Sequence, residues 1–269
     1  MSRHRGPRHN HIRPVSHMAD QIKTIQANLQ SSKDRADQVN YARGFRAPIV
    51  WPDQRLTTPA ADVHAADITA LQALAERPGQ ALLSDSAQAL LECLDCLTFT
   101  CNALKAGGLA APQIGVPLRV VVVKMNVEAV PATATEPARP ACQQTIHLIN
   151  PQIVTQSGAQ VTQEGCLSIP DVRLMVGRFA QVLVRATGLD GGGFEIGGDG
   201  LLAVVLQHEI DHLDGKMIVD GLSALRRGRI RDEMVKRKRR NLHYECPAQP
   251  VATAPPAEPL PDRPVAVLP

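Results

Sequence analysis

The 269-residue chain lacks any apolar run long enough to span a membrane, and it lacks the pattern of a secretory signal peptide. These absences argue against a membrane protein and against a disulfide-forming compartment, so we expect a cytoplasmic protein whose cysteines are mostly free thiols. The sequence also lacks an internal repeat. The formal net charge of +3 is small, but the charges are unevenly distributed along the chain. Six cysteines are present, at positions 93, 96, 101, 142, 166 and 246.

The two ends of the chain differ in composition from the middle. Residues 1–17 contain four arginines, four histidines and no acidic residue. Organellar transit peptides have this bias, but the segment has no apolar helical face, so we expect residues 1–47 to be a largely disordered extension, with organellar import as the alternative. Residues 247–269 contain eight prolines, which predicts a disordered tail over 242–269. One catalytic domain is expected between them, at 48–241.

The segment 208–212, with the sequence HEIDH, is the most informative stretch of the chain. In a helix, His208 and His212 are one turn apart and project from the same face. Two imidazoles placed in this way can hold one metal ion, and Glu209 can reach a water molecule bound to it. The apolar residues before the motif predict a buried helix over 200–214. The alternative, two core histidines beside a paired glutamate, would require three polar groups to find partners in an apolar setting.

A water-activating metal site usually has three protein ligands, so a third ligand must be found. Downstream, Ile218 stands where one class of zinc proteases has a histidine, and Glu233 lies in a strongly basic run that is typical of a surface. Upstream, Cys166 follows a glycine and precedes a short apolar segment, as a ligand at a strand edge would. With His208 and His212 it would make a sound donor set for a soft or borderline metal. For a single cysteine, burial as a small apolar residue is the usual alternative.

Three short segments occur in an order and spacing that match a known family. They read GGLAAPQ at 107–113, EGCLS at 164–168 and QHEIDH at 207–212. Together they resemble the motifs G-x-G-L-A-A-x-Q, E-G-C-L-S and Q-H-E-x-D-H of the peptide deformylases, with weaker similarity from about residue 52 to about residue 231. The first motif departs at one point, because Ala106 stands where the family has its first glycine and Gly107 where it usually has a branched residue.

The resemblance implies an enzyme that removes the N-formyl group from the N-terminal methionine of nascent polypeptides and releases formate. In such an enzyme, Glu209 would be the general acid and base, and the side chain of Gln113 and the backbone N–H of Leu167 would stabilise the oxyanion. The implied metal ligands are Cys166, His208 and His212.

The resemblance also implies a substrate peptide that binds as an added β-strand. Gln207 and Asp211 are expected to orient the histidines. The adjacent glycines of the first motif predict a mobile loop and a wider substrate cleft. The expected substrate contacts are Gly107, Gly108, Arg173, Leu201, Val204 and Val205, of which the last three would line the methionine pocket.

The identity of the metal and the activity leave alternatives open. The resemblance implies Fe(II), but a Cys-His-His set does not decide between iron and zinc, and Ni(II) or Co(II) could also substitute. Taken alone, the HExxH pattern would suggest a general zinc endopeptidase, which activity on casein would reveal. A non-catalytic, ribosome-associated binding module is the other alternative, and failure to bind any metal would favour it.

Hydrophobic patterning predicts an α+β fold, with antiparallel and mixed β-sheets packed around a central HExxH helix and with a C-terminal helix. A helical region over 66–105 is interrupted at Pro78, within an insertion around 75–88, and a loop is expected over 126–144. The final helix is expected over 225–240. The expected strands are 116–123, 146–154, 160–163, 182–186 and 194–196.

The predicted final helix is strongly basic. Residues 226–240 contain nine lysines and arginines against Asp232 and Glu233. A solvated helix face is the usual meaning of such a run. Because a deformylase would act on chains that emerge from the ribosome, contact with ribosomal RNA phosphates is the second expectation.

Overall fold

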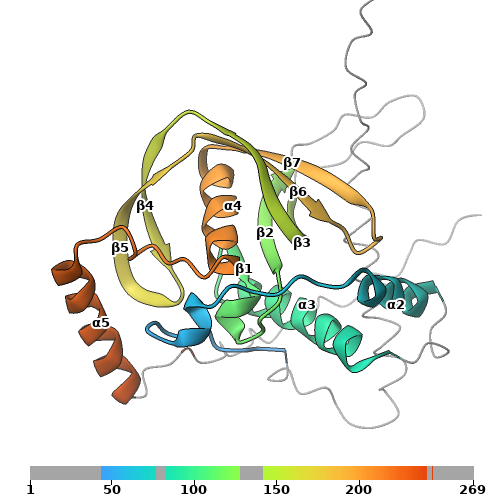
Figure 1. Cartoon of the computed structure of the whole chain (residues 1–269), viewed down its shortest axis with the longest axis horizontal. Coiled ribbons are helices and arrows are strands. Elements are labelled where there is room, and N and C mark those ends of the chain that lie inside the picture. Colours follow the sequence, from blue (N-terminus) through green and yellow to red (C-terminus); the bar gives the residue numbers. More distant parts are fainter. Residues whose placement is uncertain (1–43, 77–82, 128–141, 241–243, 245–269) are drawn as a thin grey trace, which may run out of the picture.

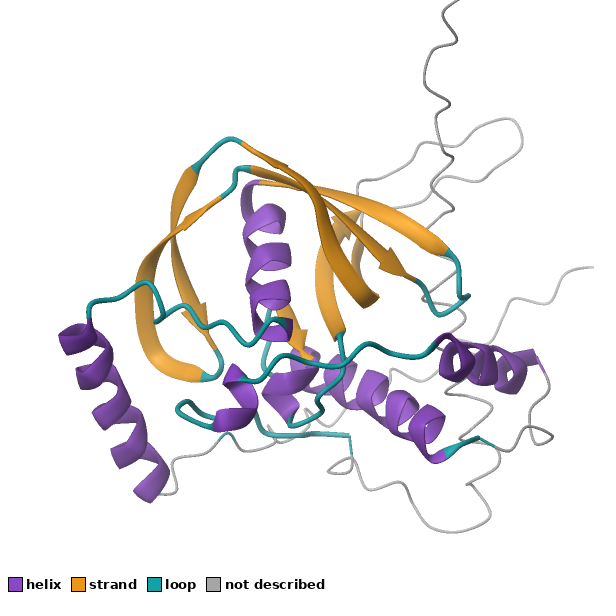
Figure 2. Cartoon of the chain, in the orientation of Figure 1, coloured by secondary structure: helices purple, strands orange, loops and turns teal. Residues whose placement is uncertain are grey.

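The structure is a computed structural model that describes residues 44–76, 83–127, 142–240 and 244 (Figure 1). Helices and short 3-10 turns lie mainly on one side of the molecule, and the strands arch over the other side (Figure 2). In chain order the elements are η2 (Gln54–Thr57), α2 (Ala65–Glu76), α3 (Asp85–Ala103), β1 (Gly108–Ala110), η3 (Ala111–Ile114), β2 (Val120–Val127), β3 (Cys142–Ser157), β4 (Gln160–Cys166), β5 (Ile169–Arg178), β6 (Gln181–Thr187), β7 (Gly193–Asp199), α4 (Gly200–Leu213) and α5 (Ala224–Arg239).

Five strands form one sheet in the order β1-β2-β3-β6-β7. Successive side chains of a strand point to opposite faces of the sheet, and in β2 both faces are covered. Val120 and Val122 pack in a core with residues of α2 and α3, whereas Val121 and Val123 pack in a second core with residues of α4. The strand expected over 116–123 is therefore present over Val120–Val127, with its valine run buried on both faces.

A separate two-stranded sheet is formed by β4 and β5. Strand β5 was not predicted from the sequence, because Pro170 and Asp171 at its start are residue types that strands disfavour: the proline cannot donate a ladder hydrogen bond, and Asp171 has a positive φ of 64°. The register shifts between Gly165 and Cys166, at the end of β4 that leads into the turn to β5. This irregularity places the cysteine at a strand end rather than within a regular ladder.

The α+β class is confirmed, but the expected mixed sheet is wrong. Every strand pair in both sheets is antiparallel, and the parallel pairing that the described residues contain is one isolated bridge between Ala61 and Leu118. The physical reason is the connectivity: within the described residues no helix returns a strand to a parallel neighbour.

Helix α4 lies between the two sheets and contacts strands of both (Figure 1). It begins after Asp199 and ends before Gly215, which has a φ of 72°, as the sequence predicted. Most of its residues are buried, but the first turn is not, since Leu201 is 78% exposed. The helix therefore combines a buried C-terminal half with an apolar N-terminal end that reaches solvent.

Most other predicted elements are present. The interrupted helical region is the pair α2 and α3, and the basic segment forms helix α5. Residues 77–82 of the predicted insertion and 128–141 of the predicted loop lie outside the described residues, as do the N-terminal extension, apart from 44–47, and the C-terminal tail, apart from residue 244. Among the described residues, no helix is both long enough and apolar enough to cross a membrane.

Candidate active site

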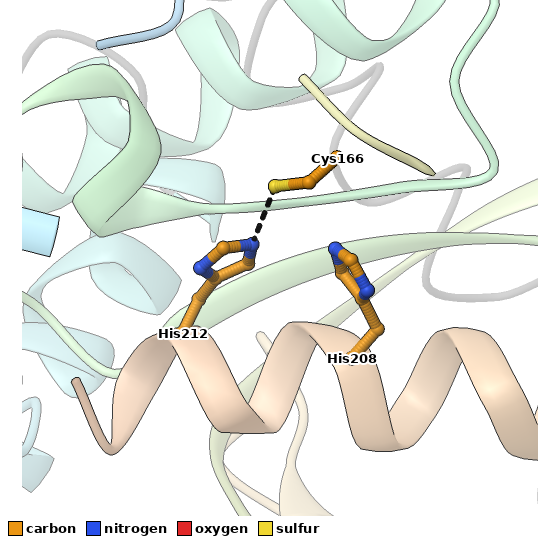
Figure 3. A group of neighbouring side chains, drawn as sticks. All are labelled: Cys166, His208 and His212. Atoms are coloured by element: carbon orange, nitrogen blue, oxygen red, sulfur yellow. Dashed lines mark hydrogen bonds between the residues drawn. The ribbon is translucent and has the colours of Figure 1, made fainter. Parts of the chain in front are cut away.

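Three potential metal ligands meet at the centre of the molecule. Cys166 ends strand β4, and His208 and His212 project from one face of α4 toward it (Figure 3). One donor atom from each residue lies within 4.8 Å of the other two, and Cys166 Sγ is 3.3 Å from His212 Nε2. The helical spacing of the histidines and the strand-end position of the cysteine thus bring together residues 46 positions apart in sequence.

The electrostatics of this cluster favour a charged thiolate. Burial alone would raise the pKa of Cys166, but His212 and His208 lower it well below its usual value. Burial would lower the pKa of His208, but Cys166 and Glu164 raise it well above the usual value. A cation bound here would take the place of the proton on His208, because a thiolate and neutral imidazoles are the forms in which these side chains coordinate a metal.

A buried ion-pair network orients His208. Its Nδ1 is 2.8 Å from Glu164 Oε2, and Glu164 accepts two hydrogen bonds from the Arg178 guanidinium, at 2.7 and 3.0 Å. Arg178 also donates to Asp211 on α4. Burial would raise the pKa of Glu164, but the hydrogen bonds from His208 and Arg178 lower it to about 2. With Nδ1 engaged in this way, the other ring nitrogen is left for a metal.

The Glu209 carboxyl is buried beside the cluster without being one of its three members. Burial raises its pKa, and its Oε2 has no hydrogen-bond partner among the described residues. Gly108 lies directly against it: a Cβ added to Gly108 would be 2.7 Å from Glu209 Oε1 and 2.9 Å from Val205. The glycine therefore leaves the space that the carboxylate occupies.

Gln113 reaches the same centre from η3. Its Nε2 lies 3.3 Å from Ser168 Oγ and 3.6 Å from Cys166 Sγ, while its Oε1 accepts a hydrogen bond from the backbone N–H of Ala110 at 2.9 Å. The side chain is thus held at one end by the backbone and presents its amide N–H₂ toward the cysteine. Leu167 follows that cysteine in the turn between β4 and β5.

A pocket of about 470 Å³ opens onto the cluster. Its lining includes Glu209, His208, Cys166, Gln113 and Leu167. All six residues expected to contact substrate also line it: Gly107, Gly108, Arg173, Leu201, Val204 and Val205.

The family model described as polypeptide deformylase matches residues 48–228. The chain belongs to the peptide deformylase family. A peptide deformylase of Xylella fastidiosa (strain M12) is 37% identical over 190 residues, which are 71% of this chain and 94% of the relative.

Solved peptide deformylase structures share the fold. The enzyme of Legionella pneumophila is 34% identical, with a TM-score of 0.54 over 74% of this chain and 98% of that chain. A Met-Ala-Ser-bound class I type b peptide deformylase from Acinetobacter baumannii is 28% identical, with a TM-score of 0.50 over 66% of this chain and 98% of that chain.

The three segments that resemble deformylase motifs converge on this pocket. Each contributes residues to its lining, among them Gln113 from the first segment, Cys166 from the second and Glu209 from the third. The two positions that would carry the third ligand in a zinc protease do not line this pocket. Ile218 packs in a hydrophobic cluster, and Glu233 is exposed on α5.

The expected orienting residues have partners outside the metal cluster. Gln207 accepts a hydrogen bond from the backbone N–H of Phe179 and donates one to its carbonyl, both at 2.9 Å, which ties the β5–β6 turn to α4. Asp211 acts on His208 only through Arg178 and Glu164. Glu164 stands in the EGCLS segment, but its ion pair with Arg178 was not predicted, because the two residues are 14 positions apart and come together when β4 pairs with β5.

Proposed function

We propose that this deformylase-family chain removes the N-formyl group from the N-terminal methionine of nascent polypeptides. The observation that carries the proposal is the cluster of Cys166, His208 and His212 donors within 4.8 Å, next to a buried Glu209 in the same pocket. In this proposal α4 is the central helix that both sheets pack around. The site of action is the cytoplasm, where nascent chains leave the ribosome.

The donor set fits one divalent metal ion held by Cys166, His208 and His212. When bound there, such an ion supplies Lewis acidity and makes a water molecule a stronger nucleophile. We propose Fe(II), because the family resemblance favours it, with Zn(II), Ni(II) or Co(II) as substitutes. Cys166→Ala is expected to lower the metal content sharply, while Glu233→Ala should leave it unchanged. An unchanged metal content in Cys166→Ala would refute this ligand set.

Glu209 is the group that moves protons. Hydrolysis forms a C–O bond at the formyl carbon and breaks the C–N bond to methionine, so one proton must leave the attacking water and one must reach the departing amine. A buried carboxylate without a hydrogen-bond partner is suited to hold that proton between the two steps. The contact with Gly108 limits where the carboxylate can lie.

Gln113 and Leu167 are proposed to stabilise the oxyanion that forms at the formyl oxygen. Gln113 is suited to this role because Ala110 holds its Oε1, which leaves the amide N–H₂ directed toward Cys166. Leu167 would contribute its backbone N–H from the turn beside the cysteine. All six expected substrate contacts line the pocket. Leu201, Val204 and Val205 are proposed to contact the methionine side chain, and Gly107, Gly108 and Arg173 the peptide backbone.

The decisive test is formate release from formyl-Met-Ala-Ser, measured anaerobically with Fe(II) or Ni(II) supplied. We expect turnover that depends on the added metal, and no cleavage of casein. Cleavage of casein together with an inert formyl peptide would overturn the proposal in favour of an endopeptidase.

The exposed cations of α5 are proposed to dock the enzyme on ribosomal RNA. The N-terminal half of α5 exposes Arg226, Arg227, Arg229 and Arg231. Their replacement by glutamine leaves the buried Met234 and the ion pair of Arg237 in place, so it tests charge without removing the helix. Co-sedimentation with ribosomes should fall in this variant and should weaken with salt. Binding that ignores both changes would refute RNA docking.

A further inference from the structure

One residue that lines the pocket lies outside the segment that the family model matches. Tyr244 lines the pocket, although it follows α5 and lies 16 positions beyond the end of the matched region at residue 228. It is half-buried against the protein rather than extended into solvent. A residue from beyond the matched region therefore completes the rim of the site.

An ion pair fixes the end of α5 near this rim. Arg237 Nη1 donates to the Asp171 carboxylate at 2.5 Å, and Asp171 itself lines the pocket at the start of β5. Tyr244 lies close enough to Asp171, Arg237 and Cys166 for their charges to influence its phenol, and burial raises its pKa to about 12. At neutral pH the phenol of Tyr244 is therefore uncharged, and its neutral aromatic ring lines the pocket at this point.

The position of Tyr244 differs from that of the apolar residues on α4. Leu201, Val204 and Val205 form an apolar surface on the helix side of the pocket, whereas Tyr244 is associated with Asp171 at the β5 side. A peptide whose formyl group lies at Glu209 and whose methionine side chain lies on α4 must direct its following residues toward another part of the rim.

We propose that Tyr244 is a substrate-contacting residue whose ring packs against the peptide beyond its methionine, and that the Asp171–Arg237 ion pair positions it. This rests on the proposed deformylase function and adds a determinant for the length of the bound peptide. A rigid aromatic ring gives a large contact area with little loss of side-chain entropy. Because the contact is made by the ring, the hydroxyl group is dispensable.

The test compares a long and a short substrate, formyl-Met-Ala-Ser and formyl-Met amide, in the full-length metal-loaded enzyme. Tyr244→Ala should raise KM for the long substrate by about three- to tenfold, with kcat little changed and the short substrate unaffected. Tyr244→Phe should behave as the wild type. Arg237→Gln should give a smaller increase in KM, while Lys238→Gln, an exposed cation on the same helix, should have no effect.

Binding of the product peptide Met-Ala-Ser, measured by calorimetry, separates this proposal from the proposed function, because it needs no turnover. Weaker binding of Met-Ala-Ser to Tyr244→Ala, with unchanged binding of methionine amide, supports the contact even if the wild type releases no formate. Equal losses for both ligands, no loss for either, or tighter binding after removal of the ring would each overturn it.

Discussion

Helices α4 and α5 are both rich in polar residues, but their surroundings give those residues opposite meanings. In α4, the side chains of Gln207, His208, Glu209 and His212 are buried, where an unpaired polar group costs free energy. In α5 the buried residue is Met234, and the charged side chains lie largely in water. Polarity therefore indicates a buried site in α4, where burial makes it costly, and a charged surface open to solvent in α5.

The largest expected effect is on kcat, and it is tested by replacing one glutamate in each helix. Glu209→Gln should lower kcat by about 100-fold or more while the metal stays bound, because the proton-transfer group is lost. Glu233→Gln, on the exposed face of α5, should leave the rate unchanged. Formate release and metal content are measured on both purified variants. A Glu209→Gln enzyme with near-normal turnover would remove Glu209 from the mechanism.

The next effect concerns the guanidinium that connects β5 to α4. Arg178→Gln should weaken metal binding by roughly ten- to a hundredfold, because Glu164 then loses the partner that fixes it against His208. Arg185→Gln is the matched control, since Arg185 forms an exposed pair with Glu195. Metal affinity is measured by competition with a chelator. Equal affinities in the two variants would show that the network does not position the ligand.

His147 tests whether a buried polar residue can lie outside any site. It is buried beneath α3, with Nε2 2.8 Å from Thr98 Oγ1 and with Nδ1 lacking a partner among the described residues. Burial lowers its pKa from 6.5 to about 4. The folded protein therefore resists protonation that the unfolded chain accepts, so stability is full above pH 6.5 and falls as the pH drops toward 4.

Between pH 7 and pH 5 this difference corresponds to about 2 kcal/mol of unfolding free energy. His147→Gln should reduce the loss of stability over that interval by about this amount, since the amide does not titrate. Urea unfolding of both metal-free proteins at the two pH values measures it. The same pH dependence in the variant and the wild type would mean that His147 is not the acid-sensitive group.

The smallest effect compares neighbouring glycines. Gly108→Ala should lower kcat/KM by about tenfold, because its Cβ would lie 2.7 Å from Glu209 Oε1 and must displace the carboxylate. Gly107→Ala should be nearly neutral in rate, since its Cβ would meet Val205 at an ordinary 3.6 Å. Gly107→Ile extends the series and tests whether the missing branched residue widens the cleft. Peptides with methionine and norleucine measure side-chain preference.

The sequence predicted the parts of the site that depend on short-range geometry. The helical spacing of His208 and His212 was sufficient to place both on one face of α4, and the requirement for a third ligand pointed to Cys166. The four buried valines of β2 were also recognisable, because a short, continuous apolar run is typical of a strand covered on both faces.

The sequence could not predict contacts that depend on tertiary pairing. Arg178 reaches Glu164 only because β5 pairs with β4, and the strand start that creates this pairing contains a proline and a residue with positive φ. Tyr244 lines the pocket although it follows α5, and Arg237 of that helix pairs with Asp171, which lines the same pocket. In both cases the contacts join segments that are distant in the chain.

The two-stranded sheet has a consequence for local unfolding. An isolated β-hairpin is marginally stable in water, so β4 and β5 depend on the hydrophobic cluster that buries Ile169 and Leu174 and on the Arg178–Asp211 pair. The five-stranded sheet has more strands and buries the valines of β2 in two cores. The amide hydrogens of β4 and β5 should therefore exchange with solvent sooner than those of β2, and the cooperative opening of this hairpin would separate Cys166 from α4 while most of the molecule stays folded.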